Sequence, residues 1–93
     1  MIVGGDAIFV NHSTVTIEDC AVLIIRGDLD IEGDNITTID GNVVVEGDLT
    51  TRNSATADGT GNIETDGEVD IRNSASVFGS SVDCSPGPCE YGS

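Results

Sequence analysis

Two stretches of the chain carry nearly the same sequence: EGDLTTRNSATADG at residues 46–59 and DGEVDIRNSASVFG at residues 66–79. Six of the fourteen positions are identical, and the two stretches begin twenty residues apart. A repeat of fixed period predicts a stacked architecture, because each copy then forms one unit that covers the next. The period therefore decides the fold, provided that it continues outside these two stretches.

The period continues through most of the chain as a glycine followed by an acidic residue. These pairs stand at spacings of 22, 20 and 20 residues, at Gly5-Asp6, Gly27-Asp28, Gly47-Asp48 and Gly67-Glu68. Aliphatic residues follow the same period, as at Leu23, Val43 and Ile63. A meander or sandwich would explain short alternating strands, but it would not explain matched positions at a constant spacing.

Within one copy the inward positions alternate in pairs. In the third copy the pairs are Val43 and Val45, Leu49 and Thr51, and Ala55 and Ala57. Each pair predicts a short strand, because successive side chains of a strand point to opposite faces. Three strands and three turns in about 20 residues describe one coil of a β-solenoid. We therefore expect an all-β fold in which residues 1–83 form about four coils. Their irregular length favours a right-handed β-helix over a left-handed hexapeptide helix.

The last ten residues depart from this pattern. CSPGPCEYGS at residues 84–93 holds both prolines and two of the three cysteines, so we expect a tail or cap rather than another coil. The spacing allows a disulfide between Cys84 and Cys89, with Pro86-Gly87 making the turn, and it is equally compatible with two free thiols. Cys20 then stays unpaired, either buried as a small hydrophobe or available to a neighbouring subunit.

The composition of the chain limits the kinds of molecule that it can bind. The 93 residues allow one domain, and 17 acidic residues against 3 basic ones leave a net charge of −14. Such a chain excludes nucleic acid as a natural partner, because binding it requires cationic groups that displace counterions. The same charge suits a soluble or halophilic protein, whose self-repulsion is screened by salt.

The sequence also bears on location. No apolar run is long enough for a transmembrane helix, so we expect no membrane insertion. The start MIVGGDAIF lacks the basic and apolar regions of a signal peptide. These features predict a cytoplasmic protein. An extracellular or virion-surface protein is the alternative if the chain is already processed.

Catalytic residues are scarce. His12 is the only histidine, and it lies in the polar turn NHST, where a lone histidine is usually a surface residue. Serine and cysteine nucleophiles would therefore lack a histidine base nearby in the sequence. We expect a protein that is not an enzyme.

Acidic residues share one position of the repeat, at Asp6, Asp28, Asp48 and Glu68. Stacked in register, they would form an acidic ladder with a rung about every 5 Å. Like charges at that distance repel, and Ca²⁺ or other cations with oxygen ligands would relieve the repulsion. Solvation and salt screening would relieve it as well. Because the chain contains no EF-hand loop and no glycine-rich calcium repeat, we assign no specific metal site and no cofactor.

The copies GNVVVEGDLTTRNSATADG at residues 41–59 and GNIETDGEVDIRNSASVFG at residues 61–79 resemble the coils of bactofilins. Those coils run as glycine, alternating aliphatics, a short polar turn, a small-residue strand and glycine again. The resemblance extends loosely over residues 1–83. It implies a right-handed β-helical protein that polymerises end to end into non-polar cytoskeletal filaments without a nucleotide.

The ends of a solenoid support the same expectation. The first and last coils present unpaired backbone edges and apolar layers, which must be capped or paired. Candidate contacts are Met1, Ile2, Val3 and Phe9 at one end and Val77, Phe78 and Val82 at the other. We therefore expect a structural protein whose partner is a further copy of itself, assembled into filaments. A viral or cell-surface spike or adhesin and an acidic cation-binding module remain the alternatives.

Overall fold

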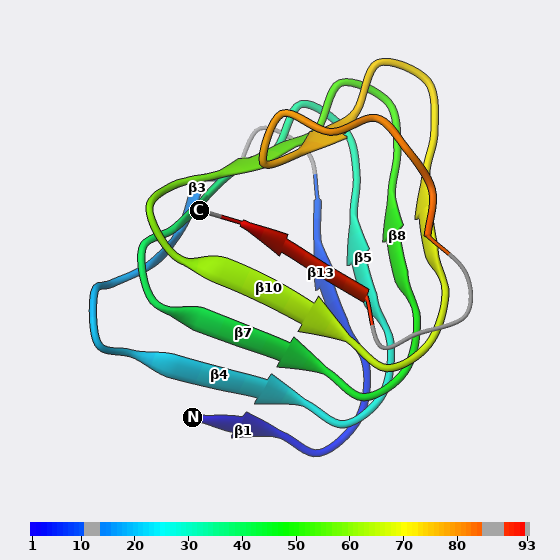
Figure 1. Cartoon of the computed structure of the whole chain (residues 1–93). Coiled ribbons are helices and arrows are strands. Elements are labelled where there is room, and N and C mark those ends of the chain that lie inside the picture. The colour runs from blue at the N-terminus through cyan, green and yellow to red at the C-terminus, as the bar shows by residue number, and fades with distance from the viewer. Residues whose placement is uncertain (11–13, 85–88, 93) are drawn as a thin grey trace.

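The structure is a computed structural model, and it describes residues 1–10, 14–84 and 89–92. Figure 1 shows a stack of coils, and the strands of these coils form three sheets. Sheet A contains β1 (Ile2–Val3), β4 (Val22–Ile25), β7 (Asn42–Val45), β10 (Asn62–Thr65) and β13 (Cys89–Gly92). Sheet B contains β2 (Ala7–Phe9), β5 (Leu29–Ile31), β8 (Leu49–Thr51) and β11 (Val69–Ile71). Sheet C contains β3 (Thr14–Ile17), β6 (Ile36–Ile39), β9 (Thr56–Asp58) and β12 (Ser76–Val77).

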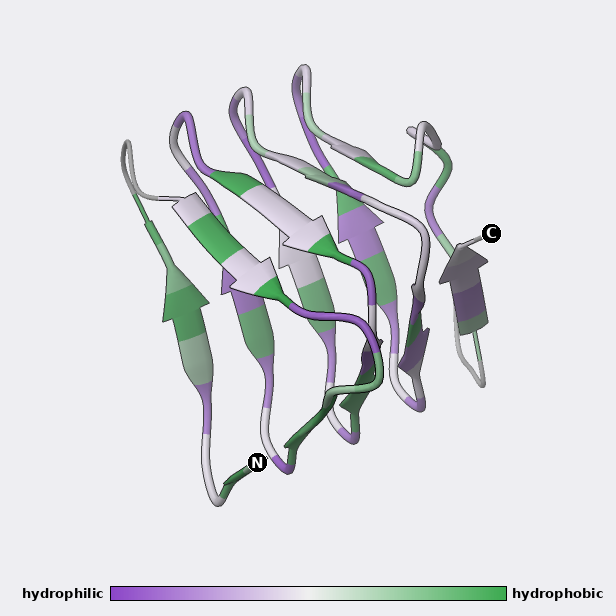
Figure 2. Ribbon diagram, turned by 90° about the vertical axis from the view of Figure 1, so that its left-hand side faces the viewer, coloured by the Kyte–Doolittle hydropathy of each residue, from purple (hydrophilic) through white to green (hydrophobic). Residues whose placement is uncertain are grey.

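Equivalent strands of successive coils pair in parallel and in register. Leu23 lies opposite Val43, which lies opposite Ile63, so the twenty-residue period of the sequence is the offset between coils. Figures 1 and 2 together show that the chain turns anticlockwise as the coils advance toward the viewer of Figure 1, which is a right-handed winding. The predicted all-β solenoid of about four coils is confirmed. Over the described residues no helix is long and apolar enough to cross a membrane.

A narrow apolar column fills the interior. From β4 to β12 the inward side chains are buried and their neighbours are more exposed, whereas the inward side chains of the first coil are only partly buried. Figure 2 shows hydrophobic residues, in green, alternating with less hydrophobic ones along several strands. The largest fully buried side chains are aliphatic, including Ile25, Leu29, Ile31, Leu49 and Ile63. Sheet C contributes the small side chains of Ala55, Ala57 and Ala75, also buried. The near absence of aromatic residues therefore fits a thin interior that aliphatic side chains can fill.

Among the residues that the structure describes, four polar ones are buried in this column. The hydroxyl of Thr37 donates a hydrogen bond to Oδ1 of Asn35, so that pair is satisfied internally. The hydroxyls of Thr51 and Thr65 are buried and have no hydrogen-bond partner. The second coil thus buries a paired polar cluster, whereas the later coils bury two unpaired hydroxyls.

The Arg-Asn-Ser turns owe their shape to their asparagines. Asn53 and Asn73 adopt left-handed backbone conformations with φ of 61° and 59°, and Gly33 occupies the same place in the second coil with φ of 77°. Asparagine tolerates this conformation better than most residues. Nδ2 of Asn73 also donates to Oδ1 of Asn53 at 3.4 Å, which links the two turns.

Two predictions concern residues that the structure does not describe. His12, predicted to be a surface residue, lies outside the described residues, and so does the predicted Pro86-Gly87 turn.

Candidate assembly interface

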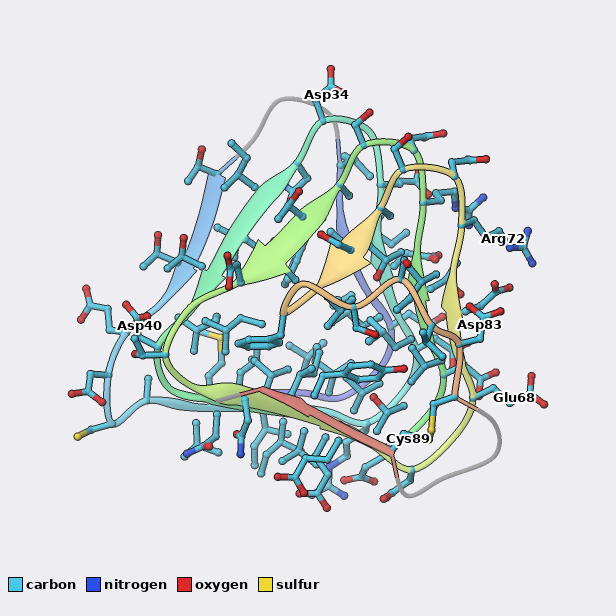
Figure 3. All side chains as sticks on the ribbon, turned by 45° about the horizontal axis from the view of Figure 1, so that its top comes forward. Asp34, Asp40, Glu68, Arg72, Asp83 and Cys89 are labelled. Carbon is cyan, nitrogen blue, oxygen red and sulfur yellow. A yellow bond between two sulfur atoms is a disulfide. The ribbon has the colours of Figure 1, made fainter. Side chains whose placement is uncertain are left out.

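The acidic ladder is present in the structure as a chain of hydrogen bonds between coils. Oδ1 of Asp6 accepts the backbone N–H of Asp28, and Oδ1 of Asp28 accepts that of Asp48, both at 2.9 Å. Oδ1 of Asp48 accepts the N–H of Glu68 at 3.0 Å. Figure 3 shows Glu68 at the periphery with its side chain directed away from the coils. Each aspartate therefore joins its own coil to the next one.

The glycine before each acid makes room for this bond. A methyl group placed on Gly47 would lie 2.2 Å from Oδ1 of Asp28 and 2.6 Å from the carbonyl oxygen of Gly27. Gly27 and Gly67 meet the same crowding against Asp6 and Asp48. The repeated Gly-Asp pair is thus one structural unit, in which glycine admits the carboxylate of the coil before it.

A second corner of the solenoid uses the same device. Oδ1 of Asp40 accepts both the N–H and the hydroxyl of Thr60, each at 3.1 Å. Across the described part of the chain, no group of three or more histidine, cysteine, aspartate or glutamate residues is arranged to hold a metal ion. The carboxylates at these corners therefore join successive coils through hydrogen bonds.

Two arginines neutralise part of the acidic surface locally. The guanidinium of Arg52 lies 3.3 Å from Oδ1 of Asp30 and 3.2 Å from Oε2 of Glu32. Nε of Arg72 donates to Oδ2 of Asp70 at 2.8 Å. This hydrogen bond lowers the pKa of Asp70, against the opposing effect of desolvation and with help from the positive charges of Arg72 and Arg52. These arginines hold surface ion pairs.

The N-terminal end of the solenoid is an open edge. Carbonyl groups of Met1 and Val3 accept the N–H groups of Ile24 and Arg26, each at 3.0 Å. Because adjacent residues of a strand direct their backbone groups to opposite sides, those of Ile2 point away from the stack. The strands β1, β2 and β3 are all terminal members of their sheets. All three sheets thus end here in strands with a free edge.

Apolar side chains surround this edge. Met1 is 87% exposed, Ile2 59% and Ile8 60%, while Val3 and Phe9 are partly buried against the core. The sequence analysis overlooked Ile8. The residues at the same position of later coils are Asp30, Thr50 and Asp70, which are all polar. An apolar residue at this one position of the repeat could have identified Ile8 from the sequence.

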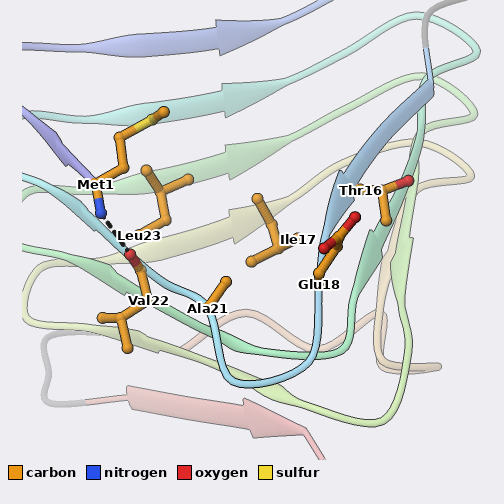
Figure 4. Close-up of a pocket in the computed structure, with 7 residues that line it drawn as sticks. All are labelled: Met1, Thr16, Ile17, Glu18, Ala21, Val22 and Leu23. Atoms are coloured by element: carbon orange, nitrogen blue, oxygen red, sulfur yellow. Dashed lines mark hydrogen bonds between the residues drawn. The ribbon is translucent and has the colours of Figure 1, made fainter.

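A hollow opens into the same end of the molecule. It has a volume of about 410 Å³ and lies between Met1, the segment Ile17–Glu18 and the segment Ala21–Leu23. Figure 4 shows the side chain of Ile17 facing this hollow from β3, across from Leu23 on β4. The backbone nitrogen of Met1 donates to the carbonyl of Val22 at 2.9 Å and closes one side. The interior column is therefore reachable from this end.

The C-terminal end is covered in all three sheets. In sheet A, β13 pairs antiparallel with β10. In sheet B, Cys84 exchanges two backbone hydrogen bonds with Val69, and Oδ1 of Asp83 accepts the N–H of Ile71 at 2.7 Å. In sheet C, Ser80 exchanges two hydrogen bonds of 2.9 Å with Val77. We call residues 80–84 and 89–92 the cap.

A disulfide joins the two parts of the cap. Cys84 and Cys89 form a disulfide bond, which is one of the two states that their spacing allowed. The hydroxyl of Tyr91 donates to the carbonyl of Val82 at 2.6 Å, and burial together with the charge of Asp83 raises the pKa of Tyr91. Figure 3 shows Asp83 and Cys89 together at the last coil. Asp83 and Tyr91 were not singled out from the sequence, because the cap lies outside the repeat.

The contacts predicted at this end have three different environments. Val77 is fully buried beneath the cap, Phe78 is partly buried against the core, and Val82 is 69% exposed. Of these, only Val82 presents a mostly exposed side chain. Elsewhere, Cys20 is an exposed free thiol in a turn with φ of 67°, so it is not the buried small hydrophobe that the sequence also allowed.

Comparisons of the chain with protein families, with curated proteins and with solved structures find no match. The proposed function therefore rests on the geometry of the two ends of the solenoid.

Proposed function

We propose that this chain is a non-enzymatic structural protein that self-assembles end to end by stacking its β-solenoid. The observation that carries the proposal is the open N-terminal end, where the free edge strands of the three sheets surround an accessible apolar column. Free strand edges are templates for pairing with a further chain, and most proteins cover or charge them. Another coil of the same kind would pair with these strand edges.

The outer side chains near this end also favour contact with another molecule. Along sheet A the outward positions run from Ile2 and Ile24 through Val44 to Glu64. The apolar outer surface is thus concentrated on the first coils, whereas the last coil is acidic. Apolar surface grouped around an open edge is typical of an interface.

Charge sets the conditions for assembly. Each chain carries a net charge of −14, so two copies repel one another at low ionic strength. At about 0.15 M salt the screening length falls to roughly 8 Å, which removes most of this repulsion between separate surfaces. We therefore expect assembly to strengthen with salt, as suits a halophilic protein.

The bactofilin-like pattern of residues 41–79 leads to the same proposal of a cytoskeletal filament. The Cys84–Cys89 disulfide, however, supports the extracellular alternative for its location, because such bonds persist mainly in oxidising compartments. The cation-binding alternative loses support from the ladder, whose aspartates already accept backbone hydrogen bonds.

Sedimentation velocity and electron microscopy of the purified chain at low and high salt test the proposal. We expect larger assemblies at high salt and unbranched fibres under the microscope. A monomer at every salt and protein concentration, both with and without a reductant, would overturn the proposal. A discrete trimer would also overturn it and would favour the spike or adhesin.

Matched variants locate the interface. Ile8→Asp places a charge beside the open edge and should abolish assembly. Ile36→Asp is the control, because Ile36 is 57% exposed, close to the 60% of Ile8, but lies on β6, an interior strand of sheet C that is paired on both edges. Equal loss of assembly in both variants would exclude the N-terminal edge as the interface.

A further inference from the structure

The cap occupies the place that the next coil of a stacked copy would take. Register in sheet A runs from Val3 through Ile25 and Val45 to Thr65. A second copy stacked with the same register would therefore set its Val3 opposite Thr65, where Cys89 now lies.

The cap also occupies the place of a stacked copy in the other two sheets. In sheet B, Ala7 of a stacked copy would lie opposite Val69, which now pairs with Cys84. In sheet C, the register from Val15 leads to Val77, which now pairs with Ser80. The cap and a stacked copy thus exclude one another at every sheet.

We propose that the cap is an autoinhibitory element locked by the Cys84–Cys89 disulfide, and that its reduction frees the C-terminal end for the N-terminal coil of a second copy. This inference rests on the proposed function and specifies how the assembly is regulated. It makes the assembly head to tail, with parallel strands continuing from one molecule into the next. The filament would then be polar, unlike the non-polar filaments that the bactofilin resemblance implies.

The reduction balances as ordinary thiol–disulfide exchange. The thiolate of a dithiol reductant attacks one cysteine sulfur and forms a mixed disulfide, while the other cysteine leaves as a thiolate and is protonated. The second thiol of the reductant then displaces the first cysteine, so two electrons and two protons convert the bond into two thiols and the reductant into its disulfide.

The cap has features that make it replaceable once the disulfide is open. Glu90 lies directly opposite Glu64 across β13 and β10, and like charges in that position destabilise a strand pair. A stacked copy would place Ile2 opposite Glu64 instead. It would also cover the last coil with three strands, where the cap offers one strand and two isolated pairs.

The test compares the oxidised and the reduced full-length chain in a Cys20→Ser background, which prevents bonds between exposed Cys20 thiols. Sedimentation velocity at high salt measures assembly, and Tyr91, the single tyrosine, reports the cap through its fluorescence. On reduction with dithiothreitol we expect the Tyr91 emission to change and the protein concentration needed for assembly to fall about tenfold.

Two variants sharpen the test. Cys84→Ser with Cys89→Ser should assemble without reductant and respond no further to it. Glu90→Lys replaces the repulsion with Glu64 by attraction, so its reduced form should assemble less than the reduced parent chain.

The outcomes separate this inference from the proposed function. Equal assembly of the oxidised and reduced chains would overturn the autoinhibition and leave the proposed function standing. A monomer in both states would overturn the proposed function itself. Loss of strand circular dichroism on reduction would show that the disulfide stabilises the whole fold, and it would also overturn the autoinhibition.

Discussion

Asp28 accepts the backbone N–H of Asp48 through Oδ1 at 2.9 Å, and Asp6 and Asp48 hold the backbone of the next coil in the same way. This contact explains why an acidic residue recurs beside glycine at every coil. A carboxylate oxygen accepts the hydrogen bond, and the glycine that precedes the acid of the next coil leaves space for it. The ladder therefore contributes to stacking even in a chain whose net charge is strongly negative.

The first prediction separates hydrogen bonding from charge in the ladder. Asp28→Ala removes the acceptor for the Asp48 N–H and should lower the free energy of unfolding by about 1 kcal/mol. Asp28→Asn keeps an acceptor oxygen in a side chain of the same size, so it should cost less. Urea unfolding of both variants measures the difference. Equal losses would mean that the carboxylate charge, rather than its acceptor oxygen, matters at this position.

The second prediction concerns the glycine beside the ladder. Gly47→Ala would place a methyl group 2.6 Å from the backbone carbonyl oxygen of Gly27, which cannot move without disturbing the stack. We expect a loss of about 2 kcal/mol or more in unfolding free energy. Gly4→Ala is the control, because no atom lies within 4 Å of the position that its methyl group would occupy. Similar losses in the two variants would contradict the steric explanation.

The third prediction uses the unpaired buried hydroxyls. Thr51→Val and Thr65→Val remove buried groups that lack a hydrogen-bond partner, so each should raise the unfolding free energy by about 1 kcal/mol. Thermal unfolding checks this. Thr37→Val is the opposite control, because its hydroxyl bonds the buried Asn35, and the variant should be destabilised. Destabilisation by all three substitutions would indicate that the two hydroxyls have partners in solution.

The fourth prediction follows from the raised pKa of Tyr91. A raised folded-state pKa means that folding favours the neutral phenol, so this contribution to stability is complete below the ordinary pKa of 10.0 and is lost as the pH rises through the folded-state pKa. Urea unfolding at a series of alkaline pH values should therefore show stability falling above pH 10. Tyr91→Phe should reduce that slope, and an unchanged slope would exclude Tyr91 as its source.

The repeat carried most of the fold prediction. Matched positions such as Val43 and Ile63 predict which residues lie opposite one another, because a sustained period leaves one register that buries every apolar pair. The cap was harder to foresee. It follows no period, and the contacts of Asp83 and Tyr91 depend on how the chain folds back over the last coil.

The candidate site was predicted unevenly for similar reasons. The sequence located the open end through Met1 and Ile2, whose apolar character is visible without a structure. The sequence also predicted which acidic residues form the ladder, but only as a row of repelling charges. The backbone N–H groups that the carboxylates accept come next to them only when the coils are stacked, so these hydrogen bonds could not be predicted.

Because the coils pair residue by residue in register, the number of coils can change without changing the residues at either end. Duplicating residues 42–61 inside the stack would add one more layer of three strands and lengthen the column by about 4.8 Å, while both terminal surfaces stay unchanged. Gene duplication of single repeats can therefore change the length of such a protein without changing the surface that either end presents for binding.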